Sequence, residues 1–428
     1  MYSPIFNDAV ERATSCYPID CVIPMLPRKL SNGICSLDPN VERLAISYSF
    51  DITENGEAEN FGVERSVIKS SKAFTYDEVQ EILDGNPQTI EENQKYLELI
   101  NLAKEASDRL SERKEKNGEL KLESREAKVV LDENRKLKDI EVRKQRKAER
   151  IIEDLMVGTN ESGAIFVNNM GLPCIFRNEE APELEKLDEN FIPLCNSLKI
   201  TPRFRNDNFA YEYKRIMSNI EDETVKVVLS NAFLRCMPKA IYEASEHGHF
   251  GLALEYYAQL TSPIRRLGDL INQHIMHKIL NFDKQPELYN EICDMYPQLV
   301  EYAKQASIGE RRGDKFERER MKRAFAEYME SHIGEEYVGI VSGFNKNGMY
   351  VQLPNTIEGL ISFKSMSNND SYNYDENKKM VVGKRSGDKF VLGTPVKIKV
   401  KKATKDGQID FSYVQKLDKK KENNTGKR

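Results

Sequence analysis

The 428-residue sequence has no hydrophobic run close to the roughly 20 apolar residues that a membrane-spanning helix needs, which excludes an integral helical membrane protein. Its first residues, MYSPIFNDAVERATSCYPID, lack the basic and then apolar pattern of a signal peptide. The seven cysteines are an odd number without a C-x-x-C pair, which favours a reducing cytoplasm over a secreted disulfide framework. Gly and Pro are few, at 23 and 16, and 39% of the residues are apolar, which excludes a wholly disordered chain.

The formal net charge of −5 argues against a nucleic-acid partner only as long as the charge is taken as uniform. Residues 381–428 hold fourteen Lys and Arg against five acids, whereas residues 1–380 are strongly acidic. A concentrated basic segment attracts phosphate backbones whatever the total charge is. The charge distribution therefore leaves RNA or DNA binding open.

The periodicity predicts an α+β chain with a mixed domain over residues 1–331. Strands are expected at 44–50 and 61–68 and in a hairpin at 127–131 and 137–142. Helices are expected from about residue 91, from about residue 148, and over 225–245, 263–280 and 297–330. The charged outer face of the first helix is interpreted as a solvated surface.

The end of the sequence predicts a second, smaller domain over residues 332–415. Five short strands with glycine turns are expected at 337–342, 348–353, 357–361, 395–402 and 408–413, which fits a closed β-barrel of the OB type. Val396, Ile398 and Val400 alternate with lysines, so one face of the fourth strand is core and the other is a lysine row. Residues 416–428 are predicted to be a disordered basic tail.

The segment HGHFGLALEYYAQLTSPIRRLGDL is the most informative part of the sequence. Ser262 is predicted to cap a helix that begins at Pro263, which places Arg265 and Arg266 in its first turn. Cations are unfavourable there, and guanidinium groups at a helix N-terminus suit an external phosphate. The alternative is a structural salt bridge between Arg265 and Asp269, and the spacing alone does not decide between the two.

This segment resembles the signature region of the RNase II / RNase R exoribonucleases, the RNB family. CYPIDCVIPMLPRKLSNGICSLDPNVERLA, EAKVVLDENRKLKDI and AERIIEDLMVGTN are similar to other family blocks in the same order. GIVSGFNKNGMYVQLPNTIEGLISF resembles the S1 RNA-binding domain that ends these enzymes, including a long insert with Tyr372 and Tyr374. The resemblance is closest to RNase R. It implies an RNB catalytic domain followed by a five-stranded S1 barrel.

The resemblance implies hydrolysis of single-stranded RNA from its 3′ end to nucleoside 5′-monophosphates, with Mg²⁺ as cofactor. Arg265 matches the arginine that binds the scissile phosphate, and Tyr17 matches a tyrosine that stacks on terminal nucleotides. Glu317 falls near a glutamate of the RNA channel, and Tyr76 and Glu153 match residues that grip the RNA end. Tyr17 alternatively belongs to the core.

In the S1 domain, the resemblance places aromatic RNA-binding positions at Phe344 and Tyr350, although strand aromatics are often only core. Lys346 and the lysine row, with Lys397 and Lys399, are expected to attract phosphates. Arg266 is expected to join them as an RNA-binding residue.

One family feature is missing. Members carry an aspartate cluster of the form D-x-x-D-x-D-D, which holds magnesium, just upstream of the region that resembles residues 1–17, and this sequence has no such cluster. We therefore expect no metal-binding residue in this chain. Three explanations stay open: a truncated product, one half of a split enzyme whose partner chain supplies the aspartates, or an RNA-binding protein that has lost catalysis. A zinc site of Cys16 and Cys21 with a histidine, or a metal site of the histidines at 247, 249, 274 and 277, is a weaker alternative to structural roles.

Overall fold

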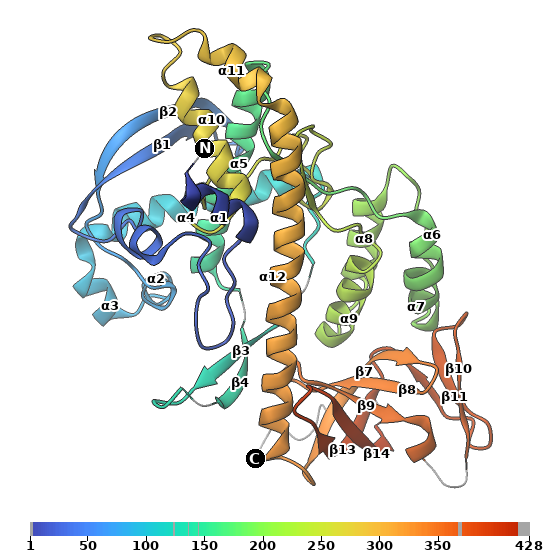
Figure 1. Ribbon diagram of the computed structural model, residues 1–428. Coiled ribbons are helices and arrows are strands. Elements are labelled where there is room, and N and C mark those ends of the chain that lie inside the picture. The colour runs from blue at the N-terminus through green and yellow to red at the C-terminus, as the bar shows by residue number, and fades with distance from the viewer. Residues whose placement is uncertain (1–2, 123–124, 136, 144, 367–369, 418–428) are drawn as a thin grey trace.

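The computed structural model describes residues 3–122, 125–135, 137–143, 145–366 and 370–417. Figure 1 shows one long helix, α12 (Tyr296–Glu330), running through the middle of the molecule. A helical part with a long β-ribbon lies at its N-terminal end, and a β-barrel lies at its C-terminal end. No helix in the described part is long and apolar enough to span a bilayer.

The N-terminal part is mainly helical, with short two-stranded sheets. Its other helices are α1 (Pro4–Arg12), α2 (Tyr76–Leu83), α3 (Pro87–Glu92), α4 (Leu97–Asn117), α5 (Lys147–Asn169), α6 (Leu184–Lys186), α7 (Ile192–Ser197), α8 (Phe209–Ser218), α9 (Glu223–Leu234), α10 (Leu267–Ile279) and α11 (Leu288–Asp294). Its strands pair as β1 (Glu42–Ile52) with β2 (Ala58–Lys69), β3 (Glu126–Leu131) with β4 (Leu137–Arg143), and β5 (Phe176–Asn178) with β6 (Ile241–Glu243).

The main core lies where α5, α10 and the first turns of α12 meet. Ala164 of α5, Ile271 and Ile275 of α10 and Leu299 of α12 are all fully buried in it. Residues 184–237 form a second core around Phe191 and further aromatic side chains of α8 and α9. Burial of these apolar side chains, at about 1.5–3 kcal/mol each, is the main contribution to the stability of this part.

The predicted five-stranded barrel is confirmed. It closes in the order β13 (Pro395–Ala403), β14 (Ile409–Lys416), β9 (Glu358–Ser362), β8 (Gly348–Gln352) and β7 (Glu336–Asn345). Val396, Ile398 and Val400 are at most 1% exposed, as the alternation predicts. The insert adds a three-stranded sheet of β10 (Tyr372–Asp375), β11 (Met380–Gly383) and β12 (Lys389–Val391) that the sequence reading missed. Met329, near the end of α12, is fully buried in the barrel core and so connects the two parts.

Three helix predictions are corrected. The helix expected from residue 91 is interrupted at Asn93, and α4 begins only at Leu97. The helix expected over 225–245 ends at Leu234, because Pro238 follows and residues 241–243 pair as a strand. The helix expected from Pro263 begins at Leu267, since Pro263 to Arg265 form a turn instead. Of the predicted tail, only Lys416, which ends β14, and Leu417 lie among the described residues.

Candidate functional site

The turn that carries Arg265 is held by a segment from the other end of the chain. The amide N–H of Ser15 donates to the carbonyl oxygen of Arg265 at 3.0 Å, and the hydroxyl of Thr14 donates to the same oxygen at 3.2 Å. The N–H of Leu267 donates to the carbonyl of Ala13 at 2.9 Å. These bonds fix the backbone on both sides of Arg265. Its half-buried side chain has no ion pair among the residues that the structure describes.

Asp269, next to this turn, pairs with Arg266 and not with Arg265. The predicted alternative of a salt bridge between Arg265 and Asp269 is therefore wrong. Asp269 is fully buried and accepts hydrogen bonds from Nε and Nη2 of Arg266 at 2.8 and 2.7 Å. It also accepts one from the N–H of Ser262 at 2.7 Å. Burial lowers the pKa of Arg266, but the attraction of Asp269 outweighs it, so the pKa lies above its ordinary value. Arg266 is thus already committed to a structural ion pair, whereas Arg265 is left for another anion.

Tyr17 and Glu317 are 300 residues apart in the sequence, yet they are in contact. The N–H of Tyr17 donates to Oε1 of Glu317 at 2.6 Å, and the Tyr17 side chain is 49% exposed. The core alternative for Tyr17 is therefore wrong. The assignment of Glu317 to the RNA channel stays a prediction.

Two glycines of α12, which the sequence reading did not single out, allow this approach. A Cβ at Gly309 would lie 2.4 Å from Cβ of Ala13, and one at Gly313 would lie 3.2 Å from Sγ of Cys16. Only a helix face without side chains lets residues 13–16 lie directly against α12. The spacing of Ala306, Gly309 and Gly313 at three and four residues was the available signal.

Tyr76 and Glu153 belong to neighbouring helices. Tyr76 is the first residue of α2, and its side chain is 43% exposed. The side chain of Gln80 on α2 accepts a hydrogen bond at 3.2 Å from the N–H of Ala148 at the start of α5, the helix that bears Glu153. Glu153 itself accepts a hydrogen bond from the side chain of Gln145.

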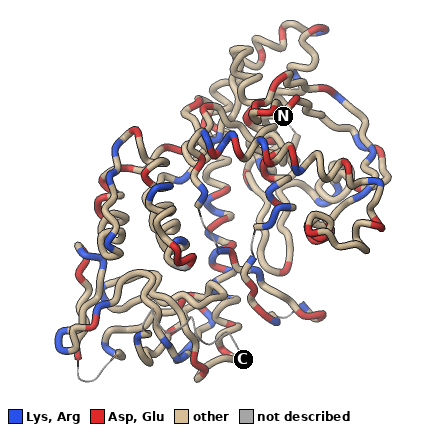
Figure 2. Tube along the Cα trace, turned by 180° about the vertical axis from the view of Figure 1, so that it is seen from behind, with Lys and Arg blue, Asp and Glu red and all other residues tan. Residues whose placement is uncertain are grey.

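Glu153 also lines a groove of about 800 Å³ between the end of α4, the start of α5 and the β3–β4 hairpin. Charges of both signs line it: Lys114, Lys121, Arg125, Arg143 and Arg150 with Glu119, Glu126, Glu149, Glu153, Asp154 and Glu223. Lys114 is buried and lies 2.9 Å from Asp154 and 3.0 Å from Glu119. Figure 2 shows Lys and Arg intermingled with Asp and Glu along the helices and loops around this groove as well.

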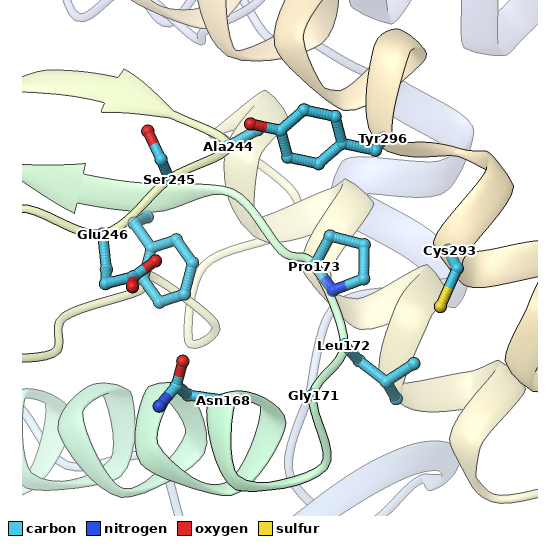
Figure 3. Close-up of a pocket in the computed structure, with 10 residues that line it drawn as sticks. Asn168, Gly171, Leu172, Pro173, Ala244, Ser245, Glu246, Cys293 and Tyr296 are labelled. Atoms are coloured by element: carbon cyan, nitrogen blue, oxygen red, sulfur yellow. The ribbon is translucent and has the colours of Figure 1, made fainter.

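A second hollow, of about 460 Å³, contains none of the predicted site residues. Figure 3 shows it between Asn168 at the end of α5, Ala244 to Glu246, and Cys293 and Tyr296 near the start of α12.

In the barrel, the predicted RNA-binding residues fall into two groups. Phe344, Lys346 and Tyr350 lie at the turn between β7 and β8. Lys397 and Lys399 instead pair with the opposite end of β7, at Val338 and Glu336. At about 3.3 Å per residue, Phe344 is roughly 20 Å along β7 from Val338, the partner of Lys397, and roughly 26 Å from Glu336, the partner of Lys399.

The two groups differ in what their side chains contact. Phe344 stacks on Tyr374 of the insert, with ring centroids 5.3 Å apart, and Tyr350 Oη accepts a hydrogen bond from Asn345 at 3.1 Å. Lys397 is paired with Glu336 at 2.7 Å, and Lys399 is exposed. The insert therefore adds the ring of Tyr374 to the Phe344 group. The sequence had indicated Tyr374 only as a member of the insert, not as a neighbour of Phe344.

The described residues contain no group of three His, Cys, Asp or Glu side chains that could hold a metal ion. His249 instead lies 3.2 Å from Glu179, and burial lowers its pKa to about 4. Three carboxylates of this part have partners within the protein: Asp269 binds Arg266, Glu317 binds the Tyr17 amide, and Glu310 accepts two hydrogen bonds from Arg177 at 2.7 and 3.0 Å.

Two family models match the sequence. The model described as "RNB domain" matches residues 1–281, and the one described as "S1 RNA binding domain" matches residues 330–414. The chain belongs to the RNB family. The resemblance drawn from the HFGLALEYYAQLTSPIRRLGDL segment and the predicted RNB-then-S1 fold class are thus confirmed.

Curated relatives give the same result for the chain as a whole. The chain is 36% identical over 416 residues to ribonuclease R 1 of Lactococcus lactis. The matched region covers 96% of this chain and 50% of that protein. It is 36% identical over 420 residues to ribonuclease R of Thermotoga maritima, covering 96% of this chain and 58% of that protein. The chain therefore spans about half the length of the curated relatives it matches.

Solved structures share the fold of this RNB chain. Mycoplasma genitalium RNase R in complex with ribose methylated single-stranded RNA matches with a TM-score of 0.85 and 24% identity, over 97% of this chain and 64% of that one. Yeast Ssd1, described as a pseudonuclease, matches with a TM-score of 0.65 and 15% identity, over 89% of this chain and 46% of that one. The fold thus occurs in a nuclease and in a pseudonuclease, so it does not by itself decide activity.

Proposed function

We propose that this chain is part of an RNase R-like exoribonuclease that degrades single-stranded RNA from its 3′ end to nucleoside 5′-monophosphates. One observation carries the proposal: residues 14–17 join the Arg265 turn to α12. Thr14 and Ser15 bind the Arg265 carbonyl, while the Tyr17 amide binds Glu317. Three segments that the family resemblance singles out separately meet at this place.

The roles follow from the contacts. The Arg265 guanidinium has no ion pair in the described part of the chain, so it is free to bind the scissile phosphate with paired N–H groups. The exposed ring of Tyr17 stacks on a terminal base without regard to sequence. Glu317 holds the backbone of Tyr17 and so orients that ring. Tyr76 and Glu153, on α2 and α5, help to grip the RNA end.

Magnesium is implied by the family, but the described residues do not fit it. They contain no group of three His, Cys, Asp or Glu side chains that could hold the ion, and Asp269 is committed to its ion pair with Arg266. We propose that acidic metal ligands come from outside this chain, and we assign no step of the reaction to the residues here beyond binding and positioning of RNA. The chain alone is then expected to bind RNA without cutting it processively.

The S1 barrel is proposed to hold the RNA strand through the aromatic group at the β7–β8 turn, with Phe344, Lys346 and Tyr350. Lys399 supplies longer-range attraction to phosphates. We propose that residues 1–331 form the catalytic domain, residues 332–415 the S1 domain and residues 416–428 a basic tail. We also propose a cytoplasmic location, supported by seven cysteines that form no disulfide.

The test is binding and degradation of a labelled single-stranded RNA by the purified chain with Mg²⁺. We expect binding at low salt and no processive degradation. The variant Phe344→Ala should lower affinity by about 1–3 kcal/mol, because it removes a stacking ring. Its control is Tyr211→Ala, which removes a tyrosine on α8 that is 71% exposed and far along the chain from the barrel. Absence of RNA binding by the unaltered chain would contradict the proposal, and processive degradation would contradict the need for outside acids.

The second candidate function is an RNA-binding protein without catalysis. It is favoured by the same lack of a metal-binding group in the described residues and by the occurrence of this fold in a pseudonuclease. The two functions differ in one outcome. If acidic residues supplied in a second polypeptide restore magnesium-dependent cleavage, the chain is part of a nuclease; if a complex forms without restoring cleavage, it is a binding protein.

A further inference from the structure

The insert of the barrel places an aromatic ring over one of the predicted RNA-binding residues. Tyr374 of β10 stacks on Phe344 of β7, with ring centroids 5.3 Å apart and ring planes 26° from parallel. β10 belongs to the three-stranded sheet of the insert and not to the barrel, so the insert sets the position of this ring. Figure 1 shows β10 and β11 on the side of the barrel away from α12.

Phe344 is largely used inside the protein. Its cross-strand partner is Met349, which is fully buried in the barrel core, and Phe344 packs against that core. Cross-strand partners share one face of a sheet, so the Phe344 side chain points toward the core. Tyr374 covers a face of the Phe344 ring, and a base can stack only on a face that is open. Phe344 therefore supports Tyr374, and Tyr374 is the outer ring of the pair.

The insert holds Tyr374 in a fixed place. Tyr372, two residues earlier on the same face of β10, is only 9% exposed and makes an edge contact with the fully buried Phe390. Beyond the end of β10, Nζ of Lys379 donates to the side-chain oxygen of Asn190 in the helical part at 3.4 Å. A ring that is already held loses little freedom when a ligand stacks on it, which lowers the cost of binding.

Tyr374 also keeps a polar group for a ligand. Its side chain is half-buried, and its hydroxyl makes no hydrogen bond within the described part of the chain. Burial, together with the nearby Glu376 and Asp375, raises the pKa of Tyr374. The hydroxyl therefore keeps its proton at neutral pH and can donate it to an oxygen of a phosphate or a base.

Two exposed lysines lie in the segments that border the ring pair. Lys346 is in the turn between β7 and β8, and Lys364 is in the short helix η5 (Phe363–Ser365). The N–H of Phe363 donates to the carbonyl of Asn347 at 3.0 Å, which joins η5 to that turn. An aromatic ring next to cationic side chains is the arrangement that binds single-stranded nucleic acids without regard to sequence.

We propose that Tyr374 is an RNA-binding residue of this chain: a base of single-stranded RNA stacks on the face of its ring opposite Phe344, and Phe344 supports the ring from behind. The inference rests on the proposed exoribonuclease function and moves the base contact from the barrel strands to the insert. Every base has a ring face to offer, so this contact does not select a sequence.

The first experiment measures binding of a labelled oligouridylate to the purified 428-residue chain at low salt. Tyr374→Ala should weaken binding by about fivefold to a hundredfold, the factor that corresponds to one lost stacking contact. Tyr374→Phe keeps the ring and should stay within about threefold of the unaltered chain. Tyr374→Ala with Phe344→Ala should bind about as weakly as Tyr374→Ala alone, because Phe344 acts through Tyr374. An abasic strand of the same length should bind the unaltered chain and Tyr374→Ala equally.

The second experiment detects the base directly. The sequence contains no tryptophan, so Tyr374→Trp introduces the single tryptophan of the chain and keeps an aromatic ring at this position. Its fluorescence should be quenched as RNA is added, with the midpoint of the binding curve, because a base stacks on the indole. The matched control is Tyr211→Trp on α8, where the tyrosine is 71% exposed and outside the barrel. That variant should bind RNA without quenching.

Several outcomes overturn the inference. One is an affinity of Tyr374→Ala equal to that of the unaltered chain, or higher, which would mean that Tyr374 blocks Phe344. Another is weaker binding by Tyr374→Ala without quenching in Tyr374→Trp, which would make Tyr374 a structural residue only. Both results leave the proposed function standing, because the unaltered chain still binds RNA. Absence of RNA binding by the unaltered chain contradicts the proposed function and this inference together.

Discussion

Replacement of Asp269 by Asn tests whether the buried ion pair holds the Arg265 turn. The carboxylate is fully buried and accepts three hydrogen bonds, two from Arg266 and one from the Ser262 N–H, at 2.7–2.8 Å. Asn keeps the shape and one acceptor oxygen, but it leaves the Arg266 guanidinium, whose side chain is only 15% exposed, without a counter-charge. Breaking a buried pair by removal of one partner costs about 3–5 kcal/mol. Because one acceptor oxygen remains, we expect the free energy of unfolding to fall by about 3 kcal/mol, the lower end of that range.

The assay is hydrogen exchange of the α10 amides, which reports the local stability of the helix that begins at Leu267, with urea unfolding followed by circular dichroism. The double variant Asp269→Asn with Arg266→Met removes both charges and should recover about half of the loss or more, since the uncompensated guanidinium is gone. A single-variant loss below about 1 kcal/mol, or no recovery in the double variant, would refute the reasoning that the ion pair is what fixes the turn.

Three further changes test other contacts. Gly309→Ala should destabilise the chain by about 1–3 kcal/mol in urea unfolding, despite the better helix propensity of Ala, because its Cβ would lie 2.4 Å from Cβ of Ala13; an increase in stability would contradict the close approach. Stability should fall as the pH drops from about 6.5 to about 4, because burial lowers the folded-state pKa of His249 to about 4 and the unfolded chain then binds the proton first. Glu179, whose pKa burial raises, offsets part of this loss, and a His249→Gln variant should show a flatter pH profile in thermal unfolding. Lys399→Gln should make the slope of log RNA affinity against log salt concentration shallower by the equivalent of about one phosphate contact. An unchanged slope would exclude a phosphate contact at that lysine.

Local patterns predicted most of the elements. The alternation in LAISYSF and the turn at Asn55-Gly56 correspond to β1, β2 and their connection, and the turn at 132–134 to the β3–β4 hairpin. These elements are formed by contacts between neighbours in sequence, so their signals are local. Pro238 was a local signal as well, and it marks where the predicted 225–245 helix is broken.

The start of α10 was not predictable in this way. Ser262 and Pro263 have the residue types of an N-cap and a first helical residue, but the Ser262 N–H is bound by the side chain of Asp269, and Arg266 is extended and bridges to Thr14. A backbone pairing across some 250 residues overrides the local preference there. The same long-range contact decides which arginine is paired and which is free, and this is why the spacing alone left the two readings of Arg265 open.

Contacts between distant parts of the chain hold the candidate site. The N–H of Ser15 binds the carbonyl of Arg265, and the N–H of Tyr17 binds the side chain of Glu317. Each contact joins a residue near the start of the sequence to one hundreds of residues later, so no local pattern could have predicted it. The backbone on both sides of Arg265 and at Tyr17 is therefore fixed by contacts within this chain.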